Sequence, residues 1–251
     1  KDLRINDYVI VRRAGDVIPE VVTSIPERRS GSEIEWSLDK RCPCGDFDIV
    51  YIKDEKVPRC SGRYDCKISK KEMLIYFASK SGLDIEGLGR ETVETLIANK
   101  LVENFEDFYS LTYEELISLP QWKEKKTQNL LEAIEKSKNS EQEKLLPALG
   151  IRYVGKQTSK LLVNTFGSIR NIFDASSDEI NNIHGISESV SSSIIEWYSE
   201  NTNKLLIRNL EEIGFRISEK IQKTTGKLSG KTFVMTGTLS NYTRQNATKI
   251  I

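Results

Sequence analysis

The sequence has no long apolar run, no excess of either charge and no leader of basic, apolar and small residues. Crossing a bilayer takes roughly 20 consecutive apolar residues, and no segment approaches that length, so a membrane protein is not expected. Lysine and arginine together number 37, as do aspartate and glutamate, so the basic excess common in nucleic-acid-binding proteins is missing. DNA binding stays open all the same, because backbone amides at helix N-termini can hold phosphate without excess positive charge.

Cysteine is missing outside residues 42–66, and a catalytic constellation is missing throughout. The chain has one histidine and no cluster of acidic metal ligands, so no residue is predicted to be catalytic. The cysteines form two close pairs, and in a chain without secretory signals this pattern favours a structural zinc site over disulfides. The predicted zinc ligands are Cys42, Cys44, Cys60 and Cys66.

The spacing of the first two cysteines argues against a regular zinc ribbon. Such ribbons normally have two residues between the first two ligands, whereas Pro43 alone separates Cys42 from Cys44. A degenerate ribbon with little or no metal is therefore an open alternative.

The N-terminal region has the composition of β structure. Residues 5–13 and 17–25 are rich in Val, Ile and Tyr, and Ala14-Gly15-Asp16 between them predicts a turn. Residues 27–37 have the Pro, Ser, Gly and charged composition of a linker. We expect a first domain over residues 1–38 and a cysteine-containing module over residues 39–68.

From residue 69 the pattern becomes helical, with apolar residues three and four positions apart, as at Leu130 and Ile134. Two capping boxes are expected, because Thr112 and Ser176 each stand three residues before a glutamate. Short turns with Gly or Pro recur at residues 85–89, 119–122, 149–155 and 183–187, with starts 34, 30 and 34 residues apart. This periodicity predicts a repeated helix, hairpin, helix unit over residues 69–218.

The hairpins are candidate phosphate-binding sites. Glycines let the chain turn tightly, so that amides at the start of the next helix can face a phosphate. A single Gly-x-Gly between helices is more often a helix cap, but four spaced copies favour a function. The second hairpin has Pro120 and Trp122 and the fourth has Ser187, so these two are expected to be structural. The predicted contacts come from the first and third hairpins: Gly87, Gly89, Arg90, Gly150, Arg152, Gly155 and Lys156.

Five motifs, in order along the chain, resemble the bacterial-type NAD-dependent DNA ligases. Arg12-Arg13-Ala14-Gly15-Asp16-Val17-Ile18-Pro19 is similar to a signature of their oligonucleotide-binding (OB) domain, and the cysteines occupy the place of their zinc finger. Residues 84–89 and 148–155 resemble their first and third hairpins, and residues 230–239 resemble the opening of their BRCT domain.

The resemblance implies a multi-domain α+β fold. Its parts would be the C-terminal part of an OB-fold β-barrel (1–38), a four-cysteine zinc finger (39–68), an all-α helix-hairpin-helix domain (69–218) and a truncated start of an α/β BRCT domain (227–251). It also implies that Arg13, Val17 and Ile18 contact DNA near a nick, with the two apolar side chains in the minor groove. The alternative, that Val17 and Ile18 fill the barrel, has equal weight.

The resemblance further implies an enzyme that seals nicks in duplex DNA during replication and repair through enzyme-AMP and DNA-adenylate intermediates. Its nucleophilic lysine lies in a Lys-x-Asp-Gly motif, which this chain lacks. NAD and Mg²⁺ are therefore expected to bind a domain outside this chain, and the chain alone is expected to be inactive. We expect the protein to be a cytoplasmic, nucleoid-associated monomer. A non-catalytic repair scaffold with the same hairpins is the alternative, and a nuclease subunit would need acidic metal ligands that the sequence lacks.

Overall fold

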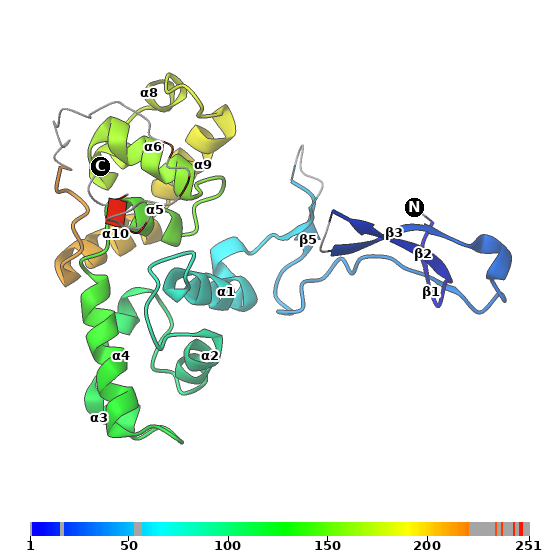
Figure 1. Cartoon of the computed structure of the whole chain (residues 1–251), viewed down its shortest axis with the longest axis horizontal. Helices are drawn as coiled ribbons and strands as arrows, with labels where there is room; N and C mark the ends of the chain where they lie inside the picture. Colours follow the sequence, from blue (N-terminus) through cyan, green and yellow to red (C-terminus); the bar gives the residue numbers. More distant parts are fainter. Residues whose placement is uncertain are drawn as a thin grey trace. The chain divides into compact units, whose positions relative to one another are not determined.

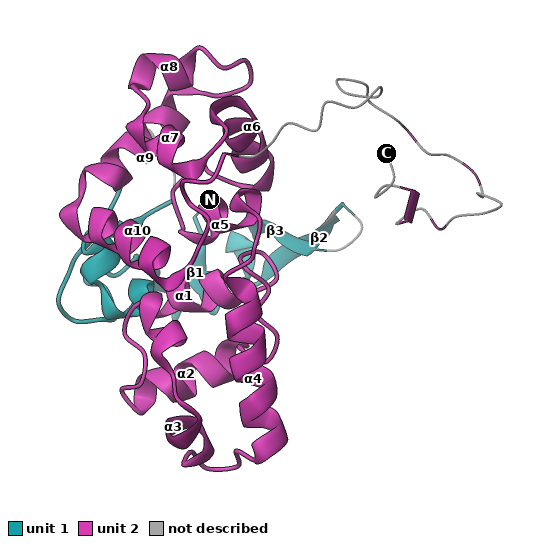
Figure 2. Cartoon of the chain, turned by 90° about the vertical axis from the view of Figure 1, so that its left-hand side faces the viewer, with its two compact units in different colours: residues 1–70 teal, residues 71–251 magenta. Residues whose placement is uncertain are grey.

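The structure is a computed structural model, and it describes residues 2–15, 18–52 and 57–220 and five isolated positions beyond them. Val17 and nearly all of the segment predicted to open a BRCT domain, residues 227–251, lie outside the described residues. Contacts divide the chain into two compact units, residues 1–70 and 71–251, which are described separately (Figure 2). The finer division into four domains stays a prediction.

The first unit is made of short antiparallel strand pairs (Figure 1). Its elements are β1 (Arg4–Ile5), β2 (Val9–Ala14), β3 (Ile18–Ser24), η1 (Pro26–Arg28), β4 (Ile34–Glu35), β5 (Ile49–Val50), β6 (Arg59–Cys60) and η2 (Arg63–Asp65). β2 pairs with β3, which confirms the two strands predicted on either side of the turn. The first predicted strand, residues 5–13, is interrupted. Asn6 has a left-handed φ of 74° and turns the chain, so β2 begins only at Val9.

The segment predicted to be a linker, residues 27–37, is in fact tied to the N-terminal strands. β4 pairs with β1, and Arg29 donates two hydrogen bonds to Asp7, of 2.7 Å to Oδ1 and 2.8 Å to Oδ2. Hydrogen bonding to Arg29 lowers the pKa of Asp7 to about 2, so the carboxylate stays charged across the neutral range. The linker prediction was wrong because composition does not reveal pairing between charges 22 residues apart in the sequence.

The second unit is helical and begins within α1. Its elements are α1 (Lys67–Ala78), α2 (Arg90–Ala98), η3 (Glu106–Ser110), α3 (Tyr113–Ile117), α4 (Glu124–Ser137), α5 (Gln142–Ala148), α6 (Lys156–Phe166), α7 (Ile169–Asp174), α8 (Ser177–Asn181), α9 (Glu188–Ser199) and α10 (Asn201–Ile213). Both predicted capping boxes are confirmed, at Thr112 with Glu115 and at Ser176 with Glu179. Among the described residues, no helix is both long and apolar enough to span a membrane.

Two aromatic clusters mark the interior of the helical unit. The ring of Phe77 in α1 lies 4.7 Å from that of Phe105 and 6.3 Å from that of Phe108. In the other half, Phe173 stacks on Trp197 and Tyr198, with centroids 5.4 and 4.4 Å apart. Helix α5 and its C-cap residue contribute a run of buried residues to the interior of the same unit: Leu145, Leu146, Pro147, Ala148 and Leu149.

Buried polar side chains fix the helices around α5. Gln142 accepts a 2.6 Å hydrogen bond from the backbone amide of Ile169 and donates one of 2.6 Å to the carbonyl of Glu219. Ser159 on α6 donates a 2.9 Å bond to the carbonyl of Glu143 on α5. Thr127 on α4 is fully buried, but its hydroxyl has no hydrogen-bond partner within the described part of the chain.

We predict opposite effects for two buried hydroxyl substitutions. Thr127→Val replaces an unpaired hydroxyl with a methyl group of similar volume, so the free energy of unfolding should rise by about 1 kcal/mol. Ser159→Ala removes a paired hydroxyl and leaves the Glu143 carbonyl without its donor, so it should lower that free energy by about 1–2 kcal/mol. Urea denaturation followed by circular dichroism measures both, and a destabilised T127V would show that the Thr127 hydroxyl is satisfied in solution.

Candidate nucleic-acid interface and metal site

The four hairpins of the helical unit share one backbone conformation. Each contains a residue in the left-handed region, two positions before the next helix's N-cap, and the φ values are 84° at Gly87, 66° at Gln121, 62° at Tyr153 and 91° at Gly185. A left-handed φ costs roughly 1–2 kcal/mol for a residue with a side chain, so its retention at Gln121 and Tyr153 indicates that the surrounding fold imposes it. Glycine is therefore not required for this turn.

The next two residues of each hairpin have two separate tasks. The second is apolar and packs inward, with Leu88, Val154 and Trp122 buried and Ile186 half-buried. The third has an extended backbone and is the N-cap of the helix that follows; these residues are Gly89, Lys123, Gly155 and Ser187. Because the first turn of a helix leaves its amides without intrahelical acceptors, every hairpin ends in a group of donors suited to a phosphate.

The space beside two of these caps is open. A Cβ added to Gly89 or Gly155 would meet no heavy atom within 4 Å, although both residues have ordinary negative φ values. Neither glycine is needed for backbone conformation or internal packing. Glycine at such a position lets another molecule approach the backbone closely.

The third hairpin begins at Ile151 rather than at Leu149, where the sequence pattern placed it. Leu149 is the C-cap of α5, and Gly150, with a φ of 74°, donates its amide to the carbonyl of Pro147 at 3.0 Å. The hairpin proper is Ile151 to Gly155, with Tyr153 at the position of Gly87. Gly150 thus ends a helix, and its contact with DNA stays a prediction.

The basic residues predicted beside the hairpins differ in the interactions that they make within the protein. Arg90, the first residue of α2, forms two 2.7 Å hydrogen bonds with the carboxylate of Glu72. The guanidinium of Arg152 lies 5.2 Å from the centre of the Tyr153 ring. Lys156, the first residue of α6, is exposed and has no ion pair within the described ranges. Of these three, Lys156 is the cation most available to a ligand.

In the first unit, the structure places two of the three residues expected near a nick. Arg13 is exposed on β2 and pairs in register with Pro19, while Ile18 opens β3 with 69% of its surface exposed. Ile18 therefore fills no core formed by the described residues. Val17 lies outside them.

The four cysteines come together despite the unusual spacing. Their sulfur atoms all lie within 4.8 Å of one another, and those of Cys42 and Cys66 are 3.8 Å apart. Four sulfurs around a tetrahedral zinc with bonds of about 2.3 Å are separated by about 3.8 Å. The donor set therefore fits zinc, and within the described ranges it is the one group of at least three metal-ligating side chains.

Local hydrogen bonds explain how the single residue Pro43 suffices between the first two cysteines. The amide of Gly45 donates to the carbonyl of Cys42 at 2.9 Å, and the amide of Cys42 donates to the carbonyl of Phe47 at 2.8 Å. Gly45 has a φ of 85°, which closes this tight turn. A Cβ on Gly62 would overlap the ring of Phe47, so glycine is also required where the second pair of cysteines approaches.

The thiols of the cluster ionise unequally. Burial alone would raise the pKa of Cys66, but hydrogen bonds from the amide and hydroxyl of Ser69 outweigh it and lower the pKa to about 6. A backbone hydrogen bond from Cys44 favours the thiolate of Cys42, yet the neighbouring thiols and burial raise its pKa to about 12. Burial also raises the pKa of Cys60. Four adjacent thiolates need a cation among them, which a bound metal would supply.

We predict that the left-handed position of the hairpins can be tested with two substitutions of opposite effect. Gln121→Gly should raise the free energy of unfolding by up to about 1 kcal/mol, because glycine adopts this conformation without strain. Gly87→Ala should lower it by about 1–2 kcal/mol, because alanine is strained at a left-handed φ. The loss would come from the backbone alone, since the added Cβ would make only ordinary contacts with Leu130. Denaturation in urea measures both, and a stabilising G87A would contradict the shared conformation.

Comparison with known proteins agrees with both units. Residues 1–33 match the family model of the NAD-dependent DNA ligase OB-fold domain, and residues 144–207 match that of the helix-hairpin-helix motif. The chain is 41% identical to a DNA ligase of Geobacter sulfurreducens over 252 residues and 39% identical to one of Anoxybacillus flavithermus over 251 residues. These alignments cover 100% and 98% of the chain but only 37% of each relative. Over nearly its whole length the chain is thus related to a segment of the DNA ligases, and its residues 1–33 belong to the OB-fold domain of the NAD-dependent ones.

Proposed function

We propose that this chain is the DNA-gripping segment of an NAD-dependent DNA ligase that seals nicks in duplex DNA. The observation that carries the proposal is the shared geometry of the four hairpins, each of which ends in free helix amides. The chain spans 37% of the length of the relatives named above, and it has no Lys-x-Asp-Gly motif. Adenylyl transfer, with NAD and Mg²⁺, is therefore assigned to the rest of the whole protein.

Phosphate binding through amides suits an enzyme that must act on any nick. Contacts to phosphate position a protein on DNA without reading its sequence, because the backbone is the same at every step. Helix N-terminal amides achieve this with little help from side-chain charge, which is consistent with a balanced overall charge. The whole protein is proposed to act as a cytoplasmic, nucleoid-associated monomer on nicked duplex DNA.

The β2–β3 hairpin is proposed to contact DNA near the nick. Ile18 is 69% exposed, and Arg13 on the paired strand is also exposed. An exposed apolar side chain next to a cation suits the minor groove, where apolar groups press against sugars and bases while arginine approaches phosphates.

Zinc is proposed as the structural metal of the cysteine cluster. The separation of Cys42 and Cys66 matches a tetrahedral site, and four cysteines fill all four positions of one. A closed site of this kind leaves no place for a reactive water, so the metal would stabilise the fold of a module with short strands. Cys42, Cys44, Cys60 and Cys66 would hold it.

The first prediction from this proposal concerns DNA affinity. The chain should bind nicked and intact duplexes with little sequence preference, and the logarithm of the binding constant should fall linearly with that of the salt concentration. Gly155→Asp should weaken binding roughly tenfold, because aspartate is a favoured N-cap that keeps the helix but occupies its amides and repels phosphate. Fluorescence polarisation measures both effects.

Ser176→Asp is the matched control for that experiment. It places the same residue at the N-cap of α8, which follows no hairpin, so affinity should stay within twofold of the unsubstituted chain. Salt-independent binding, or equal losses in the two variants, would contradict phosphate binding by the hairpin amides.

The second prediction concerns metal content. The purified chain should contain about one zinc per molecule by elemental analysis, and Cys66→Ser should reduce this content strongly because it removes one of the four thiolates. Ser61→Ala, a neighbouring change outside the ligand set, should retain the metal. A folded, metal-free preparation of the unsubstituted chain would contradict the zinc site.

A further inference from the structure

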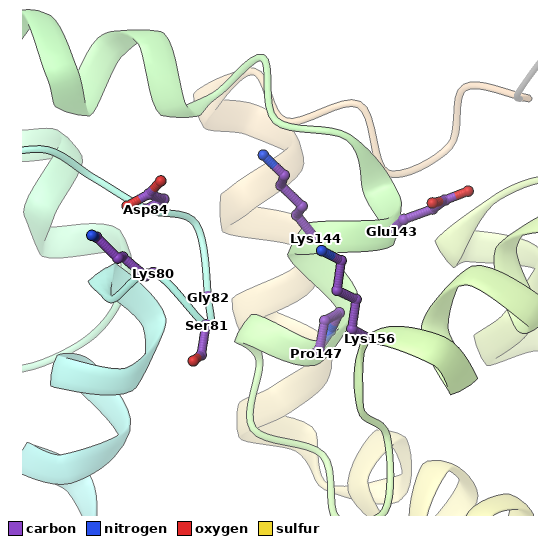
Figure 3. A pocket seen from close by; sticks show the side chains of 8 residues that line it. All are labelled: Lys80, Ser81, Gly82, Asp84, Glu143, Lys144, Pro147 and Lys156. Atoms are coloured by element: carbon purple, nitrogen blue, oxygen red, sulfur yellow. The ribbon is translucent and has the colours of Figure 1, made fainter. Parts of the chain in front are cut away.

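A pocket of about 220 Å³ lies between two parts of the helical unit that are distant in sequence (Figure 3). One wall is the loop after α1, with Lys80, Ser81, Gly82 and Asp84, which leads into the first hairpin. The other wall comes from α5 and the start of α6, with Glu143, Lys144, Pro147 and Lys156, and it adjoins the third hairpin. The pocket therefore lies beside both hairpins that the sequence favoured for phosphate binding.

The pocket has a net positive charge, carried by lysines that have no ion-pair partner in the described part of the chain. It has three lysines against two carboxylates. By contrast, two arginines of the unit are engaged, since Arg90 pairs with Glu72 and Arg170 with Glu211. In Figure 3, the side chains of Lys144 and Lys156 rise from the same wall, whereas Lys80 extends away from them on the opposite side. Lys144 and Lys156 are thus the two pocket lysines that share one wall.

Both walls are held firmly. A Cβ on Gly82 would collide with the carbonyl oxygens of Tyr76 and Phe77, so the loop packs directly on the end of α1. On the other wall, the hydroxyl of Ser159 donates to the carbonyl of Glu143 at 2.9 Å and so ties α6 to α5. The positions from which Lys144 and Lys156 project are fixed before any ligand arrives, which lowers the entropic cost of binding.

We propose that this pocket holds one phosphate of the DNA backbone, bridged by Lys144 and Lys156, in addition to the contacts of the hairpin amides. The inference rests on the proposed DNA-binding function and adds a contact that the hairpin motif does not contain, since Lys144 belongs to no hairpin. A duplex held by the adjoining hairpins presents its phosphate at high local concentration, whereas exposed lysines hold a free phosphate only weakly.

The decisive experiment measures the salt dependence of duplex binding by the double variant Lys144→Gln/Lys156→Gln. Since both lysines contact the same phosphate, the slope of log binding constant against log salt should fall in magnitude by about 0.9, the value for one contact. Affinity should fall roughly tenfold at moderate salt. The control Lys136→Gln/Lys204→Gln removes the same charge from the ends of other helices, outside pocket and hairpins, and should leave the slope unchanged.

A variant that is expected to strengthen duplex binding provides a second test. Glu143→Gln removes the charge of a residue that lines the pocket next to Lys144 and keeps the carbonyl that accepts from Ser159, so it should strengthen duplex binding about two- to threefold. Glu132→Gln removes an exposed carboxylate of α4 that does not line the pocket, and it should have a smaller effect.

The possible results distinguish failure of the pocket proposal from failure of the proposed DNA-binding function. If the unsubstituted chain binds duplex but the pocket variant and the control have equal slopes, the pocket proposal is wrong while hairpin binding stands. If inorganic phosphate perturbs the pocket in an NMR titration and the variant still binds duplex normally, the pocket is a free-anion site and the proposal is also wrong. Failure of the unsubstituted chain to bind duplex would overturn both.

Discussion

The helical unit depends on one backbone constraint, the left-handed residue in the middle of each hairpin. This residue reverses the chain so that the next side chain, such as Leu88 or Trp122, turns into the interior. The residue after it is the N-cap of a helix, whose first amides have no acceptor one helical turn earlier. Burial of the apolar residue and presentation of the amides therefore come from a single turn, and loss of the turn would weaken packing and ligand binding together.

This constraint also explains which parts of the unit could be predicted from sequence. Apolar periodicity located the helices, and the Ser and Thr residues before glutamate located two caps, because both signals are local. The third hairpin was misplaced because Gly150, which ends α5, stands close to the true turn at Tyr153. The second was predicted to be structural because it has Pro120 and Trp122 in place of glycines, and residue type gave no sign that Gln121 adopts the left-handed conformation.

The first unit shows a similar limit for turns and for contacts between distant residues. The spacing of Cys42 and Cys44 departs from that of a zinc ribbon, yet the turn closed by Gly45 brings the sulfurs to a separation suited to zinc. Composition predicted a linker where Arg29 binds Asp7. Residue type thus identified the four cysteines but not the turn that closes their unusual spacing, and it did not reveal the pairing of Arg29 with Asp7, which the fold brings together.

Equal numbers of acidic and basic residues were a weak sequence argument against DNA binding, and the structure adds a reason why the total is a poor guide. Many cations lie against carboxylates, as Arg29, Arg90 and Arg170 do, so they add little to the external field. What a phosphate experiences is the local arrangement, because salt screens exposed charges beyond about 10 Å. Unpaired lysines beside free helix amides can therefore attract DNA in a chain whose net charge is zero.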